Sequence, residues 1–201
     1  MSNSYEYIDP DYTYIDPKTG ILRNLQDISD PEVLLFVESS AVTKRLLELY
    51  ENPIKIKGVD SLFEIHRHLF QDIYIWAGKK RVVEISKDGK QFIPTTYCDN
   101  AFRYIDQLID EYRKIQKNNK RKLAEKLAEI LDNVNYLHPF REGNGRAQRE
   151  FIRLLALEKG LILNLNPPDN INVYERYMKG TVESDVTTLT ELIFELITAD
   201  K

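Results

Sequence analysis

Residues 138–149 read HPFREGNGRAQR, a polar stretch in which one expected helix ends and the next begins. The preceding stretch, NKRKLAEKLAEILDNVNYL at 119–137, carries leucines and alanines at helical spacing. Pro139 biases His138 away from helical geometry, so the first helix should end within a residue of this histidine. After the Gly-Asn-Gly turn, a second apolar stripe runs to Gly160, which predicts another helix that this turn opens.

The groups gathered in this loop suit the binding of a polyphosphate. A helix N-terminus has unpaired N–H groups and a positive dipole end, so residues 143–145 make a ready anion site. Arg146 and Arg149 share one helix face, and their planar guanidinium groups match phosphate oxygens. Glu142 can hold Mg²⁺ on two phosphates, and His138 is the natural general base. The stretch therefore predicts a nucleotidyl- or phosphoryl-transfer site.

Other phosphate-binding motifs are missing, and each feature alone has an ordinary structural interpretation. The chain has no GxxxxGK[ST] string, and no parallel βαβ pattern surrounds the glycines. A His-Pro-Phe alone is usually a packed helix end, a Gly-Asn-Gly a simple turn, and two spaced arginines a solvated face. Their combination in this order favours the functional interpretation.

The stretch closely resembles the signature of Fic-domain proteins, H-P-F-x-[DE]-G-N-G-R-x-x-R, and matches it at every specified position. The segment IHRHLFQDIYIWAGKKR at 65–81 resembles the Fic segment that leads into a β-hairpin called the flap. The resemblance covers roughly residues 15 to 200. It implies a mainly α-helical fold of about eight helices with one small hairpin. It also implies an ATP-dependent protein adenylyltransferase, which moves AMP from ATP to a hydroxyl side chain of a target protein.

The same resemblance implies a role for each residue of the stretch. His138 would deprotonate the target hydroxyl, which attacks the α-phosphorus, and Glu142 would hold Mg²⁺ on the phosphates. The remaining nucleotide-binding positions would be Gly143, Asn144 and Gly145 at the α- and β-phosphates, with Arg146 and Arg149 at the β- and γ-phosphates. Glycine at 145 favours AMP transfer, because a relative with lysine there transfers phosphate. A Fic-fold phosphotransferase and a non-enzymatic interaction module remain the alternatives.

Residues 81–94, RVVEISKDGKQFIP, predict the flap itself. Two β-branched or aromatic arms flank Asp88-Gly89, which is a strong hairpin signal. A hairpin with open edges suits the docking of an extended target segment by strand addition. By the resemblance, the flap aligns the target hydroxyl, and Lys87 contacts the nucleotide. Asn172 or Tyr174 is expected on the adenine side of the site.

The resemblance also bears on regulation. Many Fic proteins are inhibited by a helix with the string [ST]-x-x-x-E-[GN], whose glutamate pairs with the second motif arginine, here Arg149. Glu51-Asn52 lacks Ser or Thr at position 47, and Glu191 is followed by leucine, so neither fits. The layout is then most similar to stand-alone bacterial Fic toxins, which a small separate antitoxin silences by docking near residues 31–51. Known toxins of this kind modify DNA gyrase and topoisomerase IV.

Together with the two helices around the motif, helices are expected at residues 31–51, 60–72, 99–117, 121–137, 143–159, 171–179 and 185–199. Gly160 and Gly180 should end two of them. His66 and His68 are two residues apart on one helix and point to different faces, so we interpret both as structural rather than as a shared metal site. Residues 1–28 are expected to form an extended arm, and residues 29–201 the Fic domain.

Composition indicates a globular protein in a reducing compartment. The net charge of −4 gives no support for nucleic-acid or membrane binding. Cys98 is the only cysteine, so no internal disulfide can form. The start MSNSYEYIDP is unlike a signal peptide, and no apolar run approaches the ~20 residues of a membrane span. A cytoplasmic location is expected.

Overall fold

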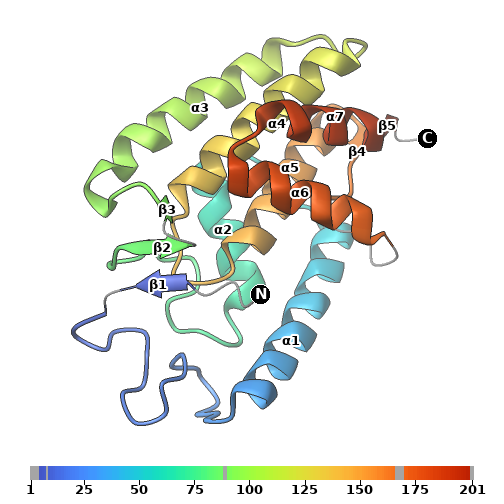
Figure 1. The fold of residues 1–201 in the computed structure, drawn as a ribbon. Helices are drawn as coiled ribbons and strands as arrows, with labels where there is room; N and C mark the ends of the chain where they lie inside the picture. The colour runs from blue at the N-terminus through green and yellow to red at the C-terminus, as the bar shows by residue number, and fades with distance from the viewer. Residues whose placement is uncertain (1–4, 8, 88–89, 166–169, 200–201) are drawn as a thin grey trace.

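The computed structural model describes residues 5–7, 9–87, 90–165 and 170–199, and this part of the chain is mainly helical (Figure 1). Its α-helices are α1 (Pro31–Glu51), α2 (Asp60–Phe70), α3 (Cys98–Lys114), α4 (Lys120–Leu137), α5 (Asn144–Glu158), α6 (Ile171–Glu183) and α7 (Val186–Leu196). A short 3₁₀ helix covers Thr95–Tyr97. The strands are β1 (Tyr5–Tyr7), β2 (Ile85–Lys87), β3 (Lys90–Gln91), β4 (Leu161–Ile162) and β5 (Thr198–Ala199). The expected mainly helical fold is confirmed.

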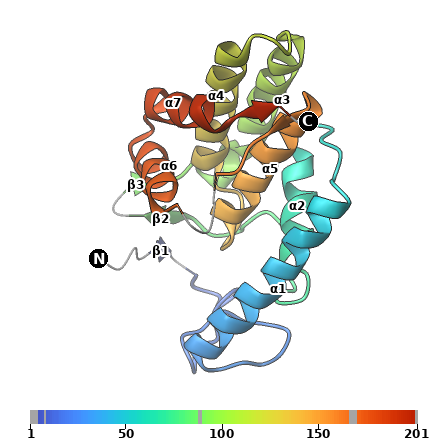
Figure 2. The same ribbon diagram turned by 90° about the vertical axis from the view of Figure 1, so that its right-hand side faces the viewer.

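Helices α4 and α5 form the centre of the molecule, because their apolar stripes are wide and face neighbours on several sides. Helix α4 packs against α3, α5 and α7, and α5 also packs against α2 (Figures 1 and 2). Buried α4 residues are Leu123, Ala124, Leu127, Ala128, Ile130, Leu131, Val134 and Leu137. The loop between these two helices, residues 138–143, is thus anchored at both ends by core helices. Within the described residues, no helix combines the length and apolar character needed to cross a membrane.

The helix boundaries follow local signals at most positions. The Asp30 side chain accepts hydrogen bonds from the first-turn amides of α1, and Pro31 follows as its first residue. Helix α4 ends at Leu137, and Gly160 takes φ +63° just after α5. The predicted ends at these places are confirmed.

Gly180 does not end a helix, so the expected stop at residue 179 is wrong. Helix α6 continues to Glu183 and is followed by Ser184 in the left-handed conformation. A Cβ at Gly180 would lie 2.6 Å from Leu189 Cδ2, so the glycine lets α7 pack closely on α6. Helix α7 also ends earlier than expected, at Leu196, because residues 198–199 pair as β5 with β4.

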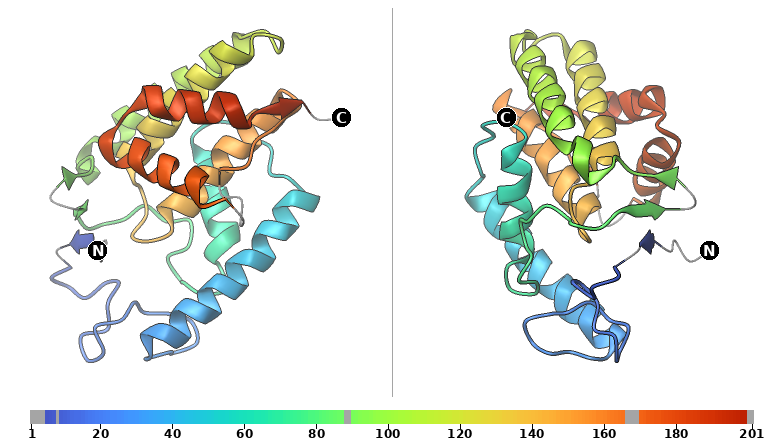
Figure 3. Two further views of the ribbon diagram at one scale, coloured as in Figure 1. Left: turned by 45° about the vertical axis from the view of Figure 1, so that its right-hand side comes forward. Right: turned by 90° about the vertical axis from the view of Figure 1, so that its left-hand side faces the viewer.

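The flap is part of a three-stranded sheet. Strands β2 and β3 pair antiparallel as predicted, whereas the expected turn at Asp88-Gly89 lies outside the described residues. Strand β1 of the N-terminal arm pairs antiparallel with β2, with Tyr5 opposite Lys87 and Tyr7 opposite Ile85 (Figure 3). The sheet order β1-β2-β3 means that the arm pairs with one edge of β2, so the outer strands of the sheet are β1 and β3.

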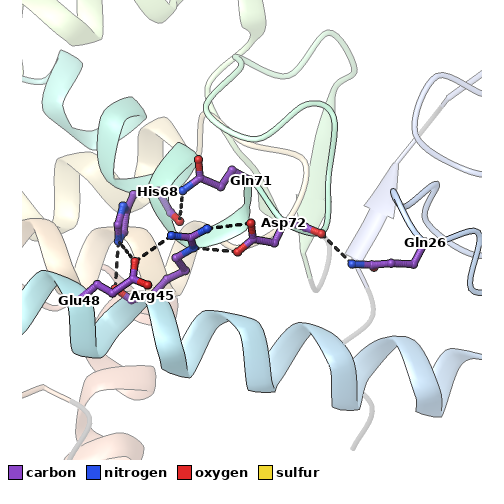
Figure 4. A network of polar contacts seen from close by, with 6 residues as sticks. All are labelled: Gln26, Arg45, Glu48, His68, Gln71 and Asp72. Carbon is purple, nitrogen blue, oxygen red and sulfur yellow. Dashed lines mark hydrogen bonds and ion pairs between the residues drawn. The ribbon is translucent and has the colours of Figure 1, made fainter.

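The rest of the arm packs on the body through specific contacts. Tyr14 is buried edge-on against Trp76, with ring centroids 5.6 Å apart, and its hydroxyl accepts a hydrogen bond from Val82 N at 3.0 Å. Farther along, the Gln26 side-chain amide donates to the Asp72 carbonyl at 2.8 Å, at the end of α2 (Figure 4). These contacts therefore join the N-terminal arm to the end of α2 and to the start of the flap.

A polar network fixes α1 on α2 at the same place (Figure 4). Arg45 of α1 donates two hydrogen bonds to the Asp72 carboxylate, at 2.7 and 2.8 Å, and one to Glu48 at 2.8 Å. The Arg45 hydrogen bonds hold the pKa of Asp72 below its ordinary value. His68 Nε2 lies 3.1 Å from the Arg45 carbonyl, so His68 belongs to this network, as the structural interpretation expects.

Candidate active site

His138 sits at the C-terminal end of α4 with φ +41° and ψ +60°, a left-handed conformation that is uncommon outside glycine. Its Nδ1 lies 3.1 Å from the Asn135 carbonyl oxygen, which can only accept, so the neutral ring carries its proton on Nδ1. Nε2 is then the nitrogen able to take up a proton. The ring stacks on Phe92 of the flap at 3.7 Å.

The Gly-Asn-Gly turn opens α5 as expected. Gly143 caps the helix with φ +81°, and a Cβ there would lie 2.4 Å from Phe70 Cζ. The first intrahelical bond runs from Ala147 N to the Gly143 carbonyl at 3.1 Å, so the amides before it form the helix end that can receive an anion. The Asn144 side chain bonds to both the N–H and the carbonyl of Phe140, which stabilises the loop. Asn144 is buried and, unlike the glycines on either side of it, is not among the residues that line the cavity.

The two motif arginines lie on the cavity side of α5 in different surroundings. Arg146 forms an ion pair of 2.6 Å with Glu38 of α1 and lies over the Phe70 ring at 4.7 Å. Arg149 lies over the Tyr177 ring at 5.1 Å. Glu142 accepts a hydrogen bond from Gly143 N at 2.9 Å and is 3.8 Å from Arg146.

These residues surround one cavity of about 620 Å³, a size that suits a nucleotide. Among the predicted site residues, His138, Glu142, Gly143, Gly145, Arg146 and Arg149 line it. Lys87 lies in β2, but its side chain is outside the described residues. Of the two residues expected on the adenine side, Tyr174 lines the cavity and Asn172 does not.

Several residues of the cavity wall escaped the sequence analysis. Besides the expected Tyr174, helix α6 contributes Tyr177, Met178, Thr181 and Val182, and the flap contributes Gln91 and Phe92. Tyr177 is buried, which raises its pKa, and its hydroxyl bonds to Gln148. Nothing in the spacing of α6 distinguishes this face from ordinary core, so no sequence signal marks it as a binding wall.

Glu38 was missed as well, although a signal exists. It lies four residues from both Leu34 and Val42 on the buried face of α1, and a carboxylate in such a stripe requires a partner. Its partners are Arg146 and the Tyr74 hydroxyl. Burial, and then the Glu38 charge, raise the pKa of Tyr74, so Tyr74 stays protonated and donates. Glu191, which does not fit the inhibitory string, pairs with Arg121 at 2.7 Å.

His66 is buried and contacts the backbone of the site at Glu142. The Gly78 N–H donates to its Nδ1 at 2.9 Å, so Nε2 carries the proton and donates to the Glu142 carbonyl at 2.9 Å. The ring stacks on Phe140 at 3.7 Å and on Phe70 at 4.6 Å. Burial, with a smaller contribution from the Arg146 charge, lowers the pKa of His66 to about 3. The neutral ring thus holds the backbone of Glu142 in place.

This shift predicts a pH dependence of stability. The unfolded chain binds a proton at His66 below its ordinary pKa of ~6.5, and the folded chain does not until about pH 3. The free energy of unfolding should therefore fall by up to ~1.4 kcal/mol per pH unit as pH drops below ~6.5. Urea unfolding between pH 7 and 4 checks this, because His66→Gln should flatten the slope. The matched variant His68→Gln should keep it; equal slopes in all three proteins would refute the assignment.

Comparison with known proteins places these observations in a family. The Fic/DOC family model matches residues 56–156. The chain is 38% identical over 148 residues to the protein adenylyltransferase VbhT of Bartonella schoenbuchensis, covering 73% of this chain and 31% of that protein. It is 31% identical over 189 residues to the probable protein adenylyltransferase Fic of Escherichia coli, covering 93% and 92% of the two chains. The chain thus spans about a third of the first relative and nearly all of the second.

Solved structures agree on the fold. The BepC effector of Bartonella tribocorum, solved with bound AMPPNP, superposes with a TM-score of 0.82 at 19% identity and covers 94% of this chain and 98% of that chain. The type IV secretion system effector BepA superposes with a TM-score of 0.78 at 26% identity, covering 92% of this chain and 68% of that chain. Together with the intact signature around one cavity, these matches show that the chain belongs to the Fic/DOC family.

Proposed function

We propose that this protein transfers AMP from ATP to a hydroxyl side chain of a target protein. The observation that carries the proposal is the convergence of His138, Glu142, Arg146 and Arg149 with the N-terminus of α5 on one nucleotide-sized cavity. The relatives named as protein adenylyltransferases support the same reaction class.

The geometry supports a single in-line displacement. His138 Nε2 accepts the proton of the target hydroxyl while that oxygen forms a bond to the α-phosphorus. The bond from the α-phosphorus to the bridging oxygen breaks, and pyrophosphate leaves with the electron pair. Gly143, Gly145 and the Asn144 amide at the start of α5 are proposed to cradle the α- and β-phosphates. Arg146 and Arg149 then neutralise the charge on the leaving pyrophosphate.

Glu142 fits the proposed Mg²⁺. It is a cavity-lining carboxylate, and among the described residues no cluster of three or more His, Cys, Asp or Glu offers an all-protein metal site. A single carboxylate is what Mg²⁺ requires when phosphate oxygens and water supply its other ligands. When bound, the ion would neutralise phosphate charge. Glu142 is held ready by the Gly143 N–H and by the His66 contact to its carbonyl.

The flap and α6 are proposed to complete the two substrate sites. The aromatic and apolar wall of Tyr174, Tyr177 and Met178 suits the adenine base, and Lys87 is proposed to reach the nucleotide from β2. A target segment would pair with β3, because β1 already covers the other edge of the flap. By resemblance to Fic toxins, DNA gyrase and topoisomerase IV are the first targets to test.

A second groove supports the proposal of a small inhibitory partner. It has a volume of about 380 Å³ and lies between α1 and α5, lined by Val42, Leu46 and Tyr50 on one side and Arg146 and Arg149 on the other. Both arginines also line the nucleotide cavity, so a partner helix in this groove can bring a glutamate to Arg149. We also propose a cytoplasmic location, with which a single cysteine is consistent.

The position of the transferred label tests the reaction. The purified chain is incubated with a bacterial lysate, Mg²⁺ and ATP labelled at either the α- or the γ-phosphate. We expect a protein band that is labelled when the label is on the α-phosphate of ATP but not when it is on the γ-phosphate. The labelling should be lost when a chelator removes Mg²⁺. Labelling from ATP that carries the label on its γ-phosphate would instead identify a phosphotransferase. No labelling from either nucleotide, with or without gyrase added as substrate, would favour an interaction module.

A further inference from the structure

Arg81, at the base of the flap, is among the largest fully buried side chains of the described residues, with 0% of its side chain exposed. Burying a guanidinium group is costly unless its donors are paired, so its partners identify what the charge is used for. Its position is unusual because it lies outside every helix and strand, between α2 and the flap sheet.

The partners of Arg81 come from three separate segments. Nε donates to the His138 carbonyl at 3.0 Å, Nη1 to the Val83 carbonyl at 2.7 Å, and Nη2 to the Ile93 carbonyl at 2.5 Å. Val83 lies before β2 and Ile93 after β3, so one side chain joins both ends of the flap to the histidine. The backbone adds a fourth link, from Arg81 N to the Pro139 carbonyl at 2.7 Å.

The guanidinium plane makes this arrangement rigid. Its donors point in fixed directions within one plane, so three carbonyls bonded to them are fixed relative to one another. The Glu84 carboxylate, whose side chain is 57% exposed, lies 3.2 Å from Nη1. Most of the bonds thus go to backbone oxygens whose positions define the flap base, rather than to a counter-ion.

The histidine needs such support, because its backbone is in a left-handed conformation that a non-glycine residue adopts at a cost of ~1–2 kcal/mol. Arg81 holds its carbonyl, Asn135 holds its Nδ1, and Phe92 of the flap stacks on its ring. Phe92 directly precedes Ile93, the residue whose carbonyl Arg81 also binds. The backbone of His138, through Arg81, and its ring, through Phe92, are therefore both held by the same part of the flap.

We infer that Arg81 is a positioning residue that fixes the position of the His138 ring relative to the flap. The inference rests on the proposed function for its kinetic consequence, since a target aligned on the flap must meet Nε2 of His138. Lysine at this position keeps the charge but presents a compact ammonium group that cannot span three carbonyls.

The first test reads the histidine rings directly. The chain has three histidines, so their ring signals in a two-dimensional NMR spectrum can be assigned by single substitutions. In Arg81→Lys the His138 signal should move while the His66 signal, which reports the buried core, stays in place. Arg113→Lys is the matched control, because Arg113 also bonds a carbonyl, that of Ile56 at 2.8 Å, but lies on α3. It should leave all three signals unchanged.

The second test is kinetic. With the same amount of the same lysate, Arg81→Lys should transfer the label of α-labelled ATP roughly 10²-fold more slowly than the wild type, as expected when a reacting group is misplaced by about 1 Å. Its affinity for the non-hydrolysable analogue AMPPNP should be unchanged, because the groups on α5 do not contact Arg81. Unchanged His138 signals in Arg81→Lys would overturn the inference. Collapse of the His66 signal in both Arg81→Lys and Arg81→Gln would also overturn it, by showing a role in the fold as a whole.

The two proposals can fail separately. If the wild-type chain transfers no label at all, the proposed function fails, while the ring signals still decide whether Arg81 orients His138. If the wild type and Arg113→Lys transfer label and Arg81→Lys does so equally well, the proposed function stands and the positioning role falls.

Discussion

His138→Ala should lower the rate of AMP transfer by ~10²–10⁴-fold, the usual contribution of a general base. The alanine removes the nitrogen that is proposed to take up the proton of the target hydroxyl, whereas the amides of α5 and the two arginines proposed to bind the phosphates remain. The affinity for AMPPNP should therefore be retained. Single-turnover transfer of α-label measures the rate, and calorimetric titration with AMPPNP measures the binding.

His68→Ala is the matched control for this experiment. His68 lies in the Arg45 network between α1 and α2, away from the cavity, and its loss should leave transfer unchanged. A His138→Ala protein that transfers label nearly as fast as the wild type would show that another group takes the proton. Loss of AMPPNP binding together with transfer would show that His138 holds the loop rather than acting in the chemistry.

Gly143→Ala should destabilise the fold by ~2–5 kcal/mol, more than most single substitutions. Two costs add at this position. The left-handed φ of +81° costs a residue with a Cβ ~1–2 kcal/mol, and overpacking a filled core costs ~1–3 kcal/mol. The overpacking arises because the new Cβ would lie 2.4 Å from Phe70 Cζ. Since Arg146 lies over the same ring, the start of α5 would also shift.

Gly20→Ala separates these two costs. Gly20 has a similar φ of +72°, but a Cβ there meets no atom within 4 Å. Its substitution should cost only the conformational ~1–2 kcal/mol. For a chain of this size each kcal/mol lowers the melting temperature by ~2–4 °C, so thermal unfolding resolves the pair. Equal losses in the two variants would mean that Phe70 moves aside freely and that the turn is not closely packed.

Features set by neighbouring residues were predictable from the sequence. Asp30-Pro31 starts α1, His138-Pro139 ends α4, and Gly160 ends α5, because capping and proline sterics act within a few residues. The site motif was predictable for the same reason, since its groups are contiguous in the chain. Six of its members do meet at the cavity.

Features set by distant partners were not predictable. Gly180 has the composition of a helix stop, but packing against Leu189 of α7 determines its place within α6. The position of Glu38 in an apolar stripe signals a partner, but not that this partner is an arginine more than a hundred residues away. The face of α6 that lines the cavity has the pattern of ordinary core. The pairing of residues 5–7 with the flap likewise depends on a contact that no local propensity encodes.

That last pairing matters for any truncation of the protein. A fragment that begins at residue 29, the expected start of the domain, would leave the N–H and carbonyl groups of β2 exposed along one side of the flap sheet. Unpaired strand edges recruit other strands, so such a fragment would be prone to edge-to-edge association and precipitation. The N-terminal arm thus supplies the third strand of this sheet, and its removal would turn β2 from a central strand into an edge strand.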